Sequence, residues 1–249
     1  MKIKTVLISQ PRPESERSPY FDIARNHKVQ VDFQPFIGVE GVPANEIRKQ
    51  KIDLSAFGCI ILTSKNAVDH YFRLAGEMRF NVPESNKYFC TTEAIALYLQ
   101  KYIVFRKRKI FFGQTGLEDL ADTFKKNKNE KFLFPCSDKH TDKISSFLKN
   151  AKVQFTPAVF YRTVATDMKD VPINSYDMLV FFSPNGVESL VHNFPNFKQG
   201  EMHIGVFGDS TAKAAEDAGL KVHLKAPLPK APSMTMALDG YLTQNHSKK

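Results

Sequence analysis

An internal repeat is the feature that most constrains what this 249-residue chain can fold into. Residues 53–68, DLSAFGCIILTSKNAV, align without gaps to residues 172–187, PINSYDMLVFFSPNGV. Both copies contain an aromatic residue, an apolar strand and then Ser-x-Asn-small-Val, which opens a helix. Residues 89–96 and 206–214 align at nearly the same displacement, with one unpaired residue. Two matches in the same order indicate duplicated domains.

Short apolar runs alternate with helical patterns throughout the chain, which is typical of βα units around parallel sheets. The runs are continuously apolar, so we expect helices to cover both faces of each sheet. The fold class that follows is α/β with parallel sheets. The predicted strands are residues 5–9, 59–63, 87–90, 110–112, 131–134, 178–183, 203–207 and 221–224.

The repeat does not divide the chain into simple halves. The copy that begins at Pro172 lacks an initial strand and helix, whereas the first strand and helix of the chain, up to Arg25, have no partner nearby. We therefore predict a discontinuous first domain, an inserted second domain, and two linker strands that pair as a hinge. Their bounds are residues 1–34 with 164–249, residues 38–156, and linkers near residues 31–37 and 157–163.

The chain carries a formal net charge of +9, from 35 Lys and Arg against 26 Asp and Glu. This excess favours an anionic partner, which could be nucleic acid, an acidic membrane surface or a polyanionic small molecule. The densest basic run, residues 106–109, lies between strand-like stretches, and no nucleic-acid-binding signature is present. We expect no nucleic acid as a partner.

The cysteines Cys59, Cys90 and Cys136 are far apart and form no CxxC pair, as in reduced cytoplasmic proteins. No apolar run is long enough to span a membrane, and the apolar N-terminal stretch is too short for a signal peptide. Metal-ligand spacings and glycine-rich phosphate loops are absent from the sequence. We therefore expect a cytoplasmic monomer without membrane attachment, metal or cofactor.

In each repeat a Ser follows the buried strand. Ser64 and Ser183 are favoured N-cap residues, whose hydroxyls can satisfy backbone N–H groups. A functional interpretation is that these helix N-termini bind carboxylates or phosphates at the carboxyl ends of the strands. Ser210 and Thr211 open a further helix after a strand. Several such N-termini would suit a ligand with many negative charges.

Tyr161 lies in the predicted linker strand 157–163. Its ring could simply pack on a neighbour. Alternatively, the phenol projects near the mouth of a cleft, where it can donate a hydrogen bond or a proton to a departing group. His70 and His192 occupy similar places in the helices after the repeated serines, but isolated helical histidines are usually surface or core residues.

Six short motifs follow one another along the chain: PRP at 11–13, TSKNAV at 63–68, LFP at 133–135, VFYRT at 159–163, FSPNGV at 182–187 and GDSTA at 208–212. In their order and spacing, the chain resembles the uroporphyrinogen-III synthase family. The resemblance covers nearly the whole chain. It implies two Rossmann-like or flavodoxin-like domains joined by a two-stranded hinge, an active site in the cleft between them, and a lyase that needs no metal or organic cofactor.

The resemblance further implies that the substrate is hydroxymethylbilane, a linear tetrapyrrole polycarboxylate. The family enzyme promotes loss of its terminal hydroxyl, inverts ring D through a spirocyclic intermediate and closes uroporphyrinogen III in haem biosynthesis. Tyr161 matches the tyrosine thought to assist departure of the hydroxyl. The expected substrate-binding residues are Ser64, Asn66, Thr91, Thr92, Ser183, Pro184, Asn185, Ser210 and Thr211.

Two places depart from the family pattern. Glu93 stands where a threonine is expected, and Cys136 follows LFP where a basic residue is often found. An acidic side chain is an unfavourable neighbour for a polyanion. Either Thr91 or Thr92 therefore binds the substrate in place of the expected threonine, or this edge of the sheet does not touch the substrate. The alternative function is therefore a degenerate, non-catalytic module that binds anionic ligands. A two-lobed periplasmic binding protein shares the architecture, but no export signal is recognisable.

Overall fold

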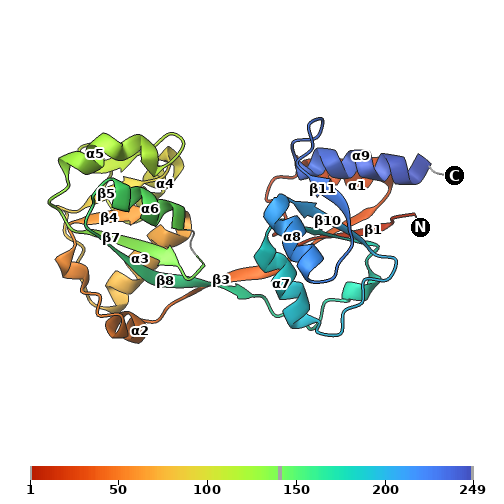
Figure 1. Ribbon diagram of the computed structural model, residues 1–249, viewed down its shortest axis with the longest axis horizontal. Helices are drawn as coiled ribbons and strands as arrows, with labels where there is room; N and C mark the ends of the chain where they lie inside the picture. Colours follow the sequence, from red (N-terminus) through yellow and green to blue (C-terminus); the bar gives the residue numbers. More distant parts are fainter. Residues whose placement is uncertain (1, 140–141, 248–249) are drawn as a thin grey trace. The chain divides into compact units, whose positions relative to one another are not determined.

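The computed structural model describes residues 2–139 and 142–247 (Figure 1). The chain divides into two compact units, which are described separately below. Unit 1 comprises Met1–Gly38 with Val164–Lys249, and unit 2 comprises Val39–Thr163. The chain passes from one unit to the other twice.

Unit 1 contains a five-stranded sheet in the order β11-β10-β9-β1-β2. The strands are β1 (Thr5–Ile8), β2 (Gln30–Phe33), β9 (Met178–Phe181), β10 (His203–Phe207) and β11 (Val222–Ala226). All four neighbouring pairs are parallel. This is the flavodoxin-like order, in which the chain changes direction across the sheet between β1 and β9. Ligands of open α/β sheets bind at the carboxyl ends of the strands that flank such a switch point.

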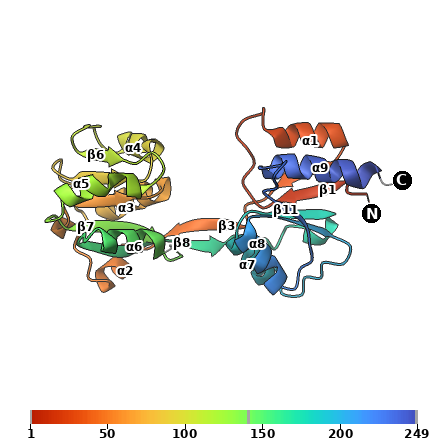
Figure 2. The same cartoon turned by 45° about the horizontal axis from the view of Figure 1, so that its top comes forward.

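Helices cover both faces of the sheet in unit 1, as Figure 2 shows. One face is covered by α1 (Pro19–His27) and α9 (Met234–Ser247), and the other by α7 (Pro184–Asn193) and α8 (Asp209–Asp217). A short 3-10 helix, η4 (Ile173–Ser175), precedes β9. Each face has its own core of buried apolar side chains, and burial of each large one stabilises the fold by about 1.5–3 kcal/mol.

Unit 2 contains a six-stranded sheet in the order β3-β8-β7-β4-β5-β6. The strands are β3 (Ile37–Gly41), β4 (Cys59–Leu62), β5 (Lys87–Cys90), β6 (Ile110–Phe112), β7 (Phe132–Ser137) and β8 (Phe155–Ala165). From β6 to β8 all neighbouring pairs are parallel. That part has the Rossmann order 3-2-1-4-5, with its switch point between β4 and β7.

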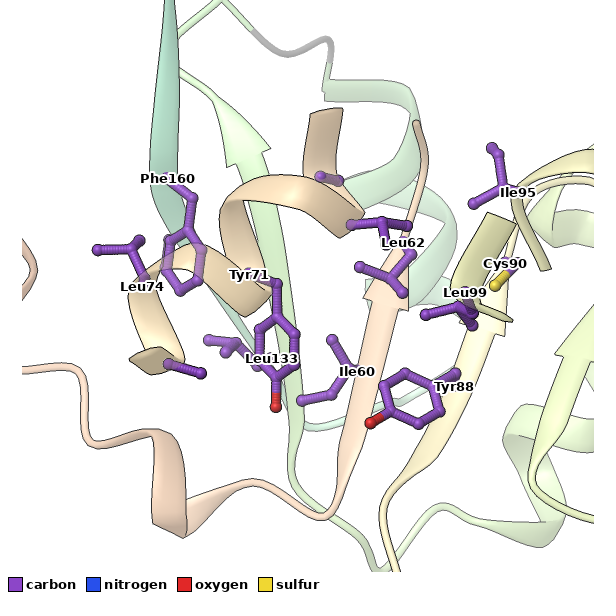
Figure 3. Close-up of a cluster of buried hydrophobic side chains, with 14 of the residues drawn as sticks. Ile60, Leu62, Tyr71, Leu74, Tyr88, Cys90, Ile95, Leu99, Leu133 and Phe160 are labelled. Atoms are coloured by element: carbon purple, nitrogen blue, oxygen red, sulfur yellow. The ribbon is translucent and has the colours of Figure 1, made fainter. Parts of the chain in front are cut away.

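The helices of unit 2 again form two layers. They are α2 (Ala44–Lys49), α3 (Lys65–Glu77) and α4 (Glu93–Tyr98) on one face, and α5 (Ala121–Lys126) and α6 (Asp142–Asn150) on the other. Three 3-10 helices complete the unit: η1 (Leu54–Ala56), η2 (Leu99–Lys101) and η3 (Leu117–Leu120). Figure 3 shows the core under α3, where the ring of Tyr71 lies near Leu133 of β7. Tyr71 and Phe160 of β8 stack with ring centroids 6.5 Å apart.

The predicted α/β class with two parallel sheets is confirmed. In the structure, the segments expected as linkers belong largely to sheet strands. Residues 157–163 lie within β8, which pairs with β7 on one side and adjoins β3 on the other. The stretch near residues 31–37 consists of the end of β2, a connection and the start of β3. The physical reason is burial: Phe160 is fully buried in the core of unit 2.

All three cysteines are free and buried. No helix among the described residues has the length and apolar character needed to cross a membrane.

Candidate active site

Ser64 begins α3 directly after β4, at the switch point of unit 2. Its backbone is extended, and its Oγ accepts a hydrogen bond from the N–H of Ala67 at 3.0 Å. The hydroxyl therefore caps the helix as predicted. Asn66 is exposed in the first turn, where backbone N–H groups and the helix dipole favour an anion.

Thr91 and Thr92 follow β5, the strand next to β4. Thr91 Oγ1 donates to the carbonyl of Thr63 at 3.3 Å, so this hydroxyl ties the ends of the two strands together. Thr92 occupies the N-cap position of α4 but its side chain makes no capping hydrogen bond. Glu93 is exposed in the first turn of that helix. Its carboxylate makes the start of α4 less favourable for binding an anion.

Tyr161 lies in β8, and its phenol reaches the start of α3. The hydroxyl is 3.1 Å from Ser64 Oγ, and either atom can be the donor. Tyr161 is only 7% exposed and its ring packs on neighbouring residues, as in the first of the two alternatives that the sequence leaves open. The cause is the packing of α3 against β8, which covers the ring. Burial raises the pKa of Tyr161, although the hydrogen bond with Ser64 opposes that rise. The phenol is therefore protonated at neutral pH.

His70 was not selected as a site residue by sequence reasoning, yet it contacts Tyr161. The two rings stack with centroids 5.2 Å apart and an interplanar angle of 18°. His70 Nδ1 accepts a hydrogen bond of 3.1 Å from Nε of Arg73. Burial and the nearby guanidinium lower the pKa of His70. No local sequence signal marks this contact, because it depends on where β8 passes α3.

Asp138, which follows Cys136 and Ser137, is held by hydrogen bonds at the end of β7. Asp138 accepts hydrogen bonds from the backbone N–H of Thr163 at 3.1 Å and from the Ser137 hydroxyl at 2.9 Å. Burial disfavours the charged carboxylate, but these hydrogen bonds outweigh it and lower the pKa of Asp138. The carboxylate thus joins the end of β7 to β8. Cys136 itself is buried in the sheet and donates to the carbonyl of Ala158.

In unit 1, Ser183 repeats the role of Ser64. It follows β9 at the switch point, and its Oγ accepts from the N–H of Gly186 at 3.3 Å. Pro184 at the first helical position has no N–H to leave unsatisfied, and Asn185 follows it; both are half-buried. Ser9, after β1, borders the same point and is an additional polar residue that the sequence did not single out.

Ser210 and Thr211 lie in the first turn of α8, after β10. Ser210 is exposed, whereas Thr211 is only 1% exposed. Ser210 is therefore the more accessible of the two to an anion. Gly208 begins the helix with a φ of 86°, a conformation that favours glycine. Asp209 is paired with Lys225 at 2.6 Å, which offsets its charge at this helix N-terminus.

Across the residues that the structure describes, no group of three or more His, Cys, Asp or Glu side chains could hold a metal ion. The site in unit 2 is instead a hydrogen-bonded set of a neutral phenol, a serine hydroxyl and helix N–H groups. Such a set can donate a proton and accommodate carboxylates.

Known proteins resemble this chain in sequence family and in fold. The family model described as uroporphyrinogen-III synthase HemD matches residues 20–236. A uroporphyrinogen-III synthetase from Helicobacter pylori has the same fold, with a TM-score of 0.60 at 17% identity over 97% of this chain and all of that one. A mutant uroporphyrinogen III synthase from the extremely thermophilic bacterium Thermus thermophilus gives a TM-score of 0.53 at 14% identity, covering 99% of this chain and 100% of the other. A search of curated protein sequences gives no match. Because the family model spans most of its length, the chain belongs to the uroporphyrinogen-III synthase family.

Proposed function

We propose that Tyr161 is the general acid with which this chain releases the terminal hydroxyl of hydroxymethylbilane. Membership of the family assigns the overall reaction, which is the cyclisation of hydroxymethylbilane to uroporphyrinogen III by a lyase of tetrapyrrole biosynthesis. The observation that carries the residue assignment is the 3.1 Å contact between the Tyr161 hydroxyl and Ser64 Oγ. It joins a neutral phenol to the start of a helix at a sheet switch point.

Tyr161 gives its phenolic proton to the substrate hydroxyl, the C–O bond breaks, and water leaves with the bonding electron pair. The lone pair of the adjacent pyrrole nitrogen stabilises the cation that remains. Ring D attacks this carbon during cyclisation, and the proton that is finally lost from the closing ring restores the phenol. The net change is loss of one water molecule.

Ser64 is positioned to stabilise the phenolate form of Tyr161. Once the phenol has lost its proton, Ser64 can turn its hydroxyl hydrogen toward the phenolate oxygen. The Ala67 N–H still donates to Ser64 Oγ at 3.0 Å, so the start of α3 helps to stabilise the negative charge. The hydrogen bond between Ser64 and Tyr161 favours the phenolate, because it lowers the pKa of Tyr161.

We further propose that substrate carboxylates bind at the helix N-termini of each unit. The supporting features are the capped starts of α3 and α7, the exposed Ser210 of α8, and the net charge of +9. The proposed binding residues are Ser64, Asn66, Thr91, Thr92, Ser183, Pro184, Asn185, Ser210 and Thr211. Thr211 is almost fully buried, so Ser210 is the more accessible of the two residues at the start of α8.

We also infer that the chain works as a monomer in the cytoplasm and without nucleic acid. Three buried, unpaired thiols support a reducing compartment. In the basic run, Arg106 is paired with Glu84 at 2.7 Å, so this run is partly neutralised.

The test is incubation of the purified protein with enzymatically generated hydroxymethylbilane. The substrate cyclises spontaneously to the I isomer without ring inversion, so the ratio of isomer III to isomer I reports catalysis. We expect isomer III to predominate. If only isomer I forms while the tetrapyrrole still binds, the chain is a non-catalytic binding module.

A further inference from the structure

The ring of Tyr161 is held by a chain of contacts that leads away from its hydroxyl. One face of the ring lies on His70, with centroids 5.2 Å apart. His70 in turn accepts a 3.1 Å hydrogen bond from Arg73, one helical turn further along α3. The proposed acid is therefore fixed at two points, by Ser64 at its hydroxyl and by His70 at its ring.

Arg73 is itself anchored to the backbone on either side of this site. Its Nη2 donates to the carbonyl of Val42 at 2.7 Å and contacts the carbonyl of Phe160, the residue before Tyr161, at 3.4 Å. Its Nη1 pairs with Glu77. A Cβ at Gly41 would lie 2.7 Å from the Arg73 guanidinium carbon, so a side chain there would displace the guanidinium.

The hydrogen bond from Arg73 also fixes the form of the imidazole. Because Nε of Arg73 is a donor, His70 Nδ1 must be unprotonated and Nε2 carries the hydrogen. Burial and the Arg73 charge lower the pKa of His70, whereas Asp69 and Glu77 oppose that change. The ring that faces Tyr161 is thus a neutral imidazole with a defined orientation.

The strand alone does not fix the position of Tyr161. The register between β7 and β8 shifts between Cys136 and Ser137, so that Ser137 faces Tyr161 after Cys136 has faced Val159. At such an irregularity the side chain direction departs from the regular alternation of the sheet. The stack on His70 adds a contact from outside the sheet, which holds the ring at this irregular position.

We infer that His70, oriented by Arg73, is a positioning residue that holds the Tyr161 phenol on Ser64. This inference rests on the proposed function, because it concerns the placement of the proposed acid. His70 takes no part in proton transfer. It covers one face of the tyrosine ring, excludes water from it and restricts its rotation.

The experiment compares His70→Ala, which removes the stack, with His70→Phe, which keeps an aromatic face. Tyrosine labelled with carbon-13 at Cζ reports the ionisation of each phenol by NMR, and the Tyr161→Phe variant assigns the Tyr161 signal. In the wild type the pKa of Tyr161 should exceed the ordinary value of about 10, because the ring is buried. In His70→Ala it should fall toward about 10 as water enters, and in His70→Phe it should stay raised.

Catalysis supplies the second measurement. For His70→Ala we expect kcat for isomer III to fall about tenfold, within the range caused by a misplaced catalytic group, with KM little changed. His70→Phe should recover most of this loss. Gly41→Ala, which displaces the Arg73 guanidinium without removing it, should give an intermediate fall. His192→Ala on α7 is the control, since it removes an exposed histidine from the corresponding helix of the other repeat.

The inference is overturned if His70→Ala leaves the Tyr161 signal, its pKa and kcat unchanged. It is also overturned if His70→Phe is as impaired as His70→Ala although both fold, as judged by circular dichroism. A wild-type protein that yields only isomer I would instead refute the proposed function, whatever the spectra show. A failure of the positioning role alone would leave isomer III formation by the wild type intact.

Discussion

Ser64 and Tyr161 are 97 residues apart in the sequence, yet their side-chain oxygens lie 3.1 Å from each other. Ser64 is the N-cap of α3, and Tyr161 belongs to β8, two strands away from β4 in the sheet. A single serine hydroxyl therefore completes the start of a helix and contacts a buried phenol. Mutation of Ser64 removes both contacts at once. Comparison with Ser183, which caps α7 in the same way, separates helix capping from the contact with the phenol.

Tyr161→Phe should reduce the rate of isomer III formation by about 100-fold, the order expected for loss of a general acid. The fold should persist, because the ring and its stack on His70 are retained. The measurement is the initial rate of isomer III, with the spontaneous formation of isomer I as an internal reference. An unimpaired variant would remove Tyr161 from the mechanism and leave the family assignment standing.

Ser64→Ala and Ser183→Ala form a matched pair of substitutions. Both remove an N-cap that accepts a backbone hydrogen bond, so each should lower the free energy of unfolding by about 1 kcal/mol. Only Ser64→Ala should also raise the pKa of the Tyr161 phenol further, because the hydrogen bond that favours the phenolate is lost. Urea unfolding measures the first effect and tyrosine NMR the second.

Activity separates the two variants as well. Ser64→Ala should lower kcat, since the phenolate formed after proton transfer loses its hydrogen-bond donor. Equal losses of kcat and equal phenol titrations in the two variants would mean that the contact between Ser64 and Tyr161 has no catalytic consequence.

The fold was accessible to sequence reasoning because its strands are buried on both faces. The residues of β4 and β9, for example, are all buried, and such continuous apolar runs are recognisable without knowledge of their neighbours. The capping roles of Ser64 and Ser183 were equally accessible, since a capping residue acts on amides within its own helix. Local chemistry determines both features.

The surroundings of Tyr161 were not accessible in the same way. Its burial and its stack on His70 depend on the crossing of α3 over β8, which joins residues distant in the sequence. The burial of Thr211 likewise depends on what packs against the first turn of α8. Residue type and spacing carry no information about such tertiary contacts.

The buried thiols should make the protein less stable as the pH rises above about 8.5. Burial raises the pKa of Cys59 and Cys90 to about 12 and that of Cys136 to about 11. In the unfolded chain these thiols ionise near about 8.5. Above that pH the unfolded state binds fewer protons than the folded state, so the free energy of unfolding falls until the pH reaches the folded-state values.

Urea unfolding at a series of pH values measures this loss. The midpoint should be steady between neutrality and about pH 8.5 and decrease beyond it. A thiol reagent provides the control, because all three cysteines should react quickly in urea and slowly in the native protein. A midpoint that does not change up to strongly alkaline pH would contradict the proposed effect of burial.

Residues 39–163 should fold by themselves. The two cores of unit 2 are formed entirely by residues between Val42 and Tyr161, and a segment with its own core can fold independently. We expect this fragment to unfold cooperatively in urea, as followed by circular dichroism. A gradual, uncooperative transition would argue against unit 2 as a domain.

A shorter fragment, residues 38–156, tests where this domain ends. It lacks Phe160, which is fully buried and accepts a 2.9 Å hydrogen bond from the N–H of Val42. Loss of such a ring alone costs about 3–5 kcal/mol, so the shorter fragment should be largely unfolded. Equal stability of the two fragments would place the boundary before β8 reaches Phe160.

Added salt should weaken substrate binding and leave catalysis nearly unchanged. The net charge of +9 attracts a polycarboxylate. The Debye length, over which this attraction acts, shortens from about 10 Å at 0.1 M salt to about 3 Å at 1 M. KM for hydroxymethylbilane should therefore rise with ionic strength, whereas kcat should be little affected, because Tyr161 is buried from solvent ions.

Lys65→Gln removes a cation from the first turn of α3, beside Ser64, and should raise KM at low salt and reduce its salt dependence. Lys149→Gln, in the last turn of α6, is the matched loss of charge away from the proposed helix N-termini and should have a smaller effect. Identical salt dependences in both variants would show that only the overall charge attracts the substrate, and a KM indifferent to salt would contradict recognition through carboxylates.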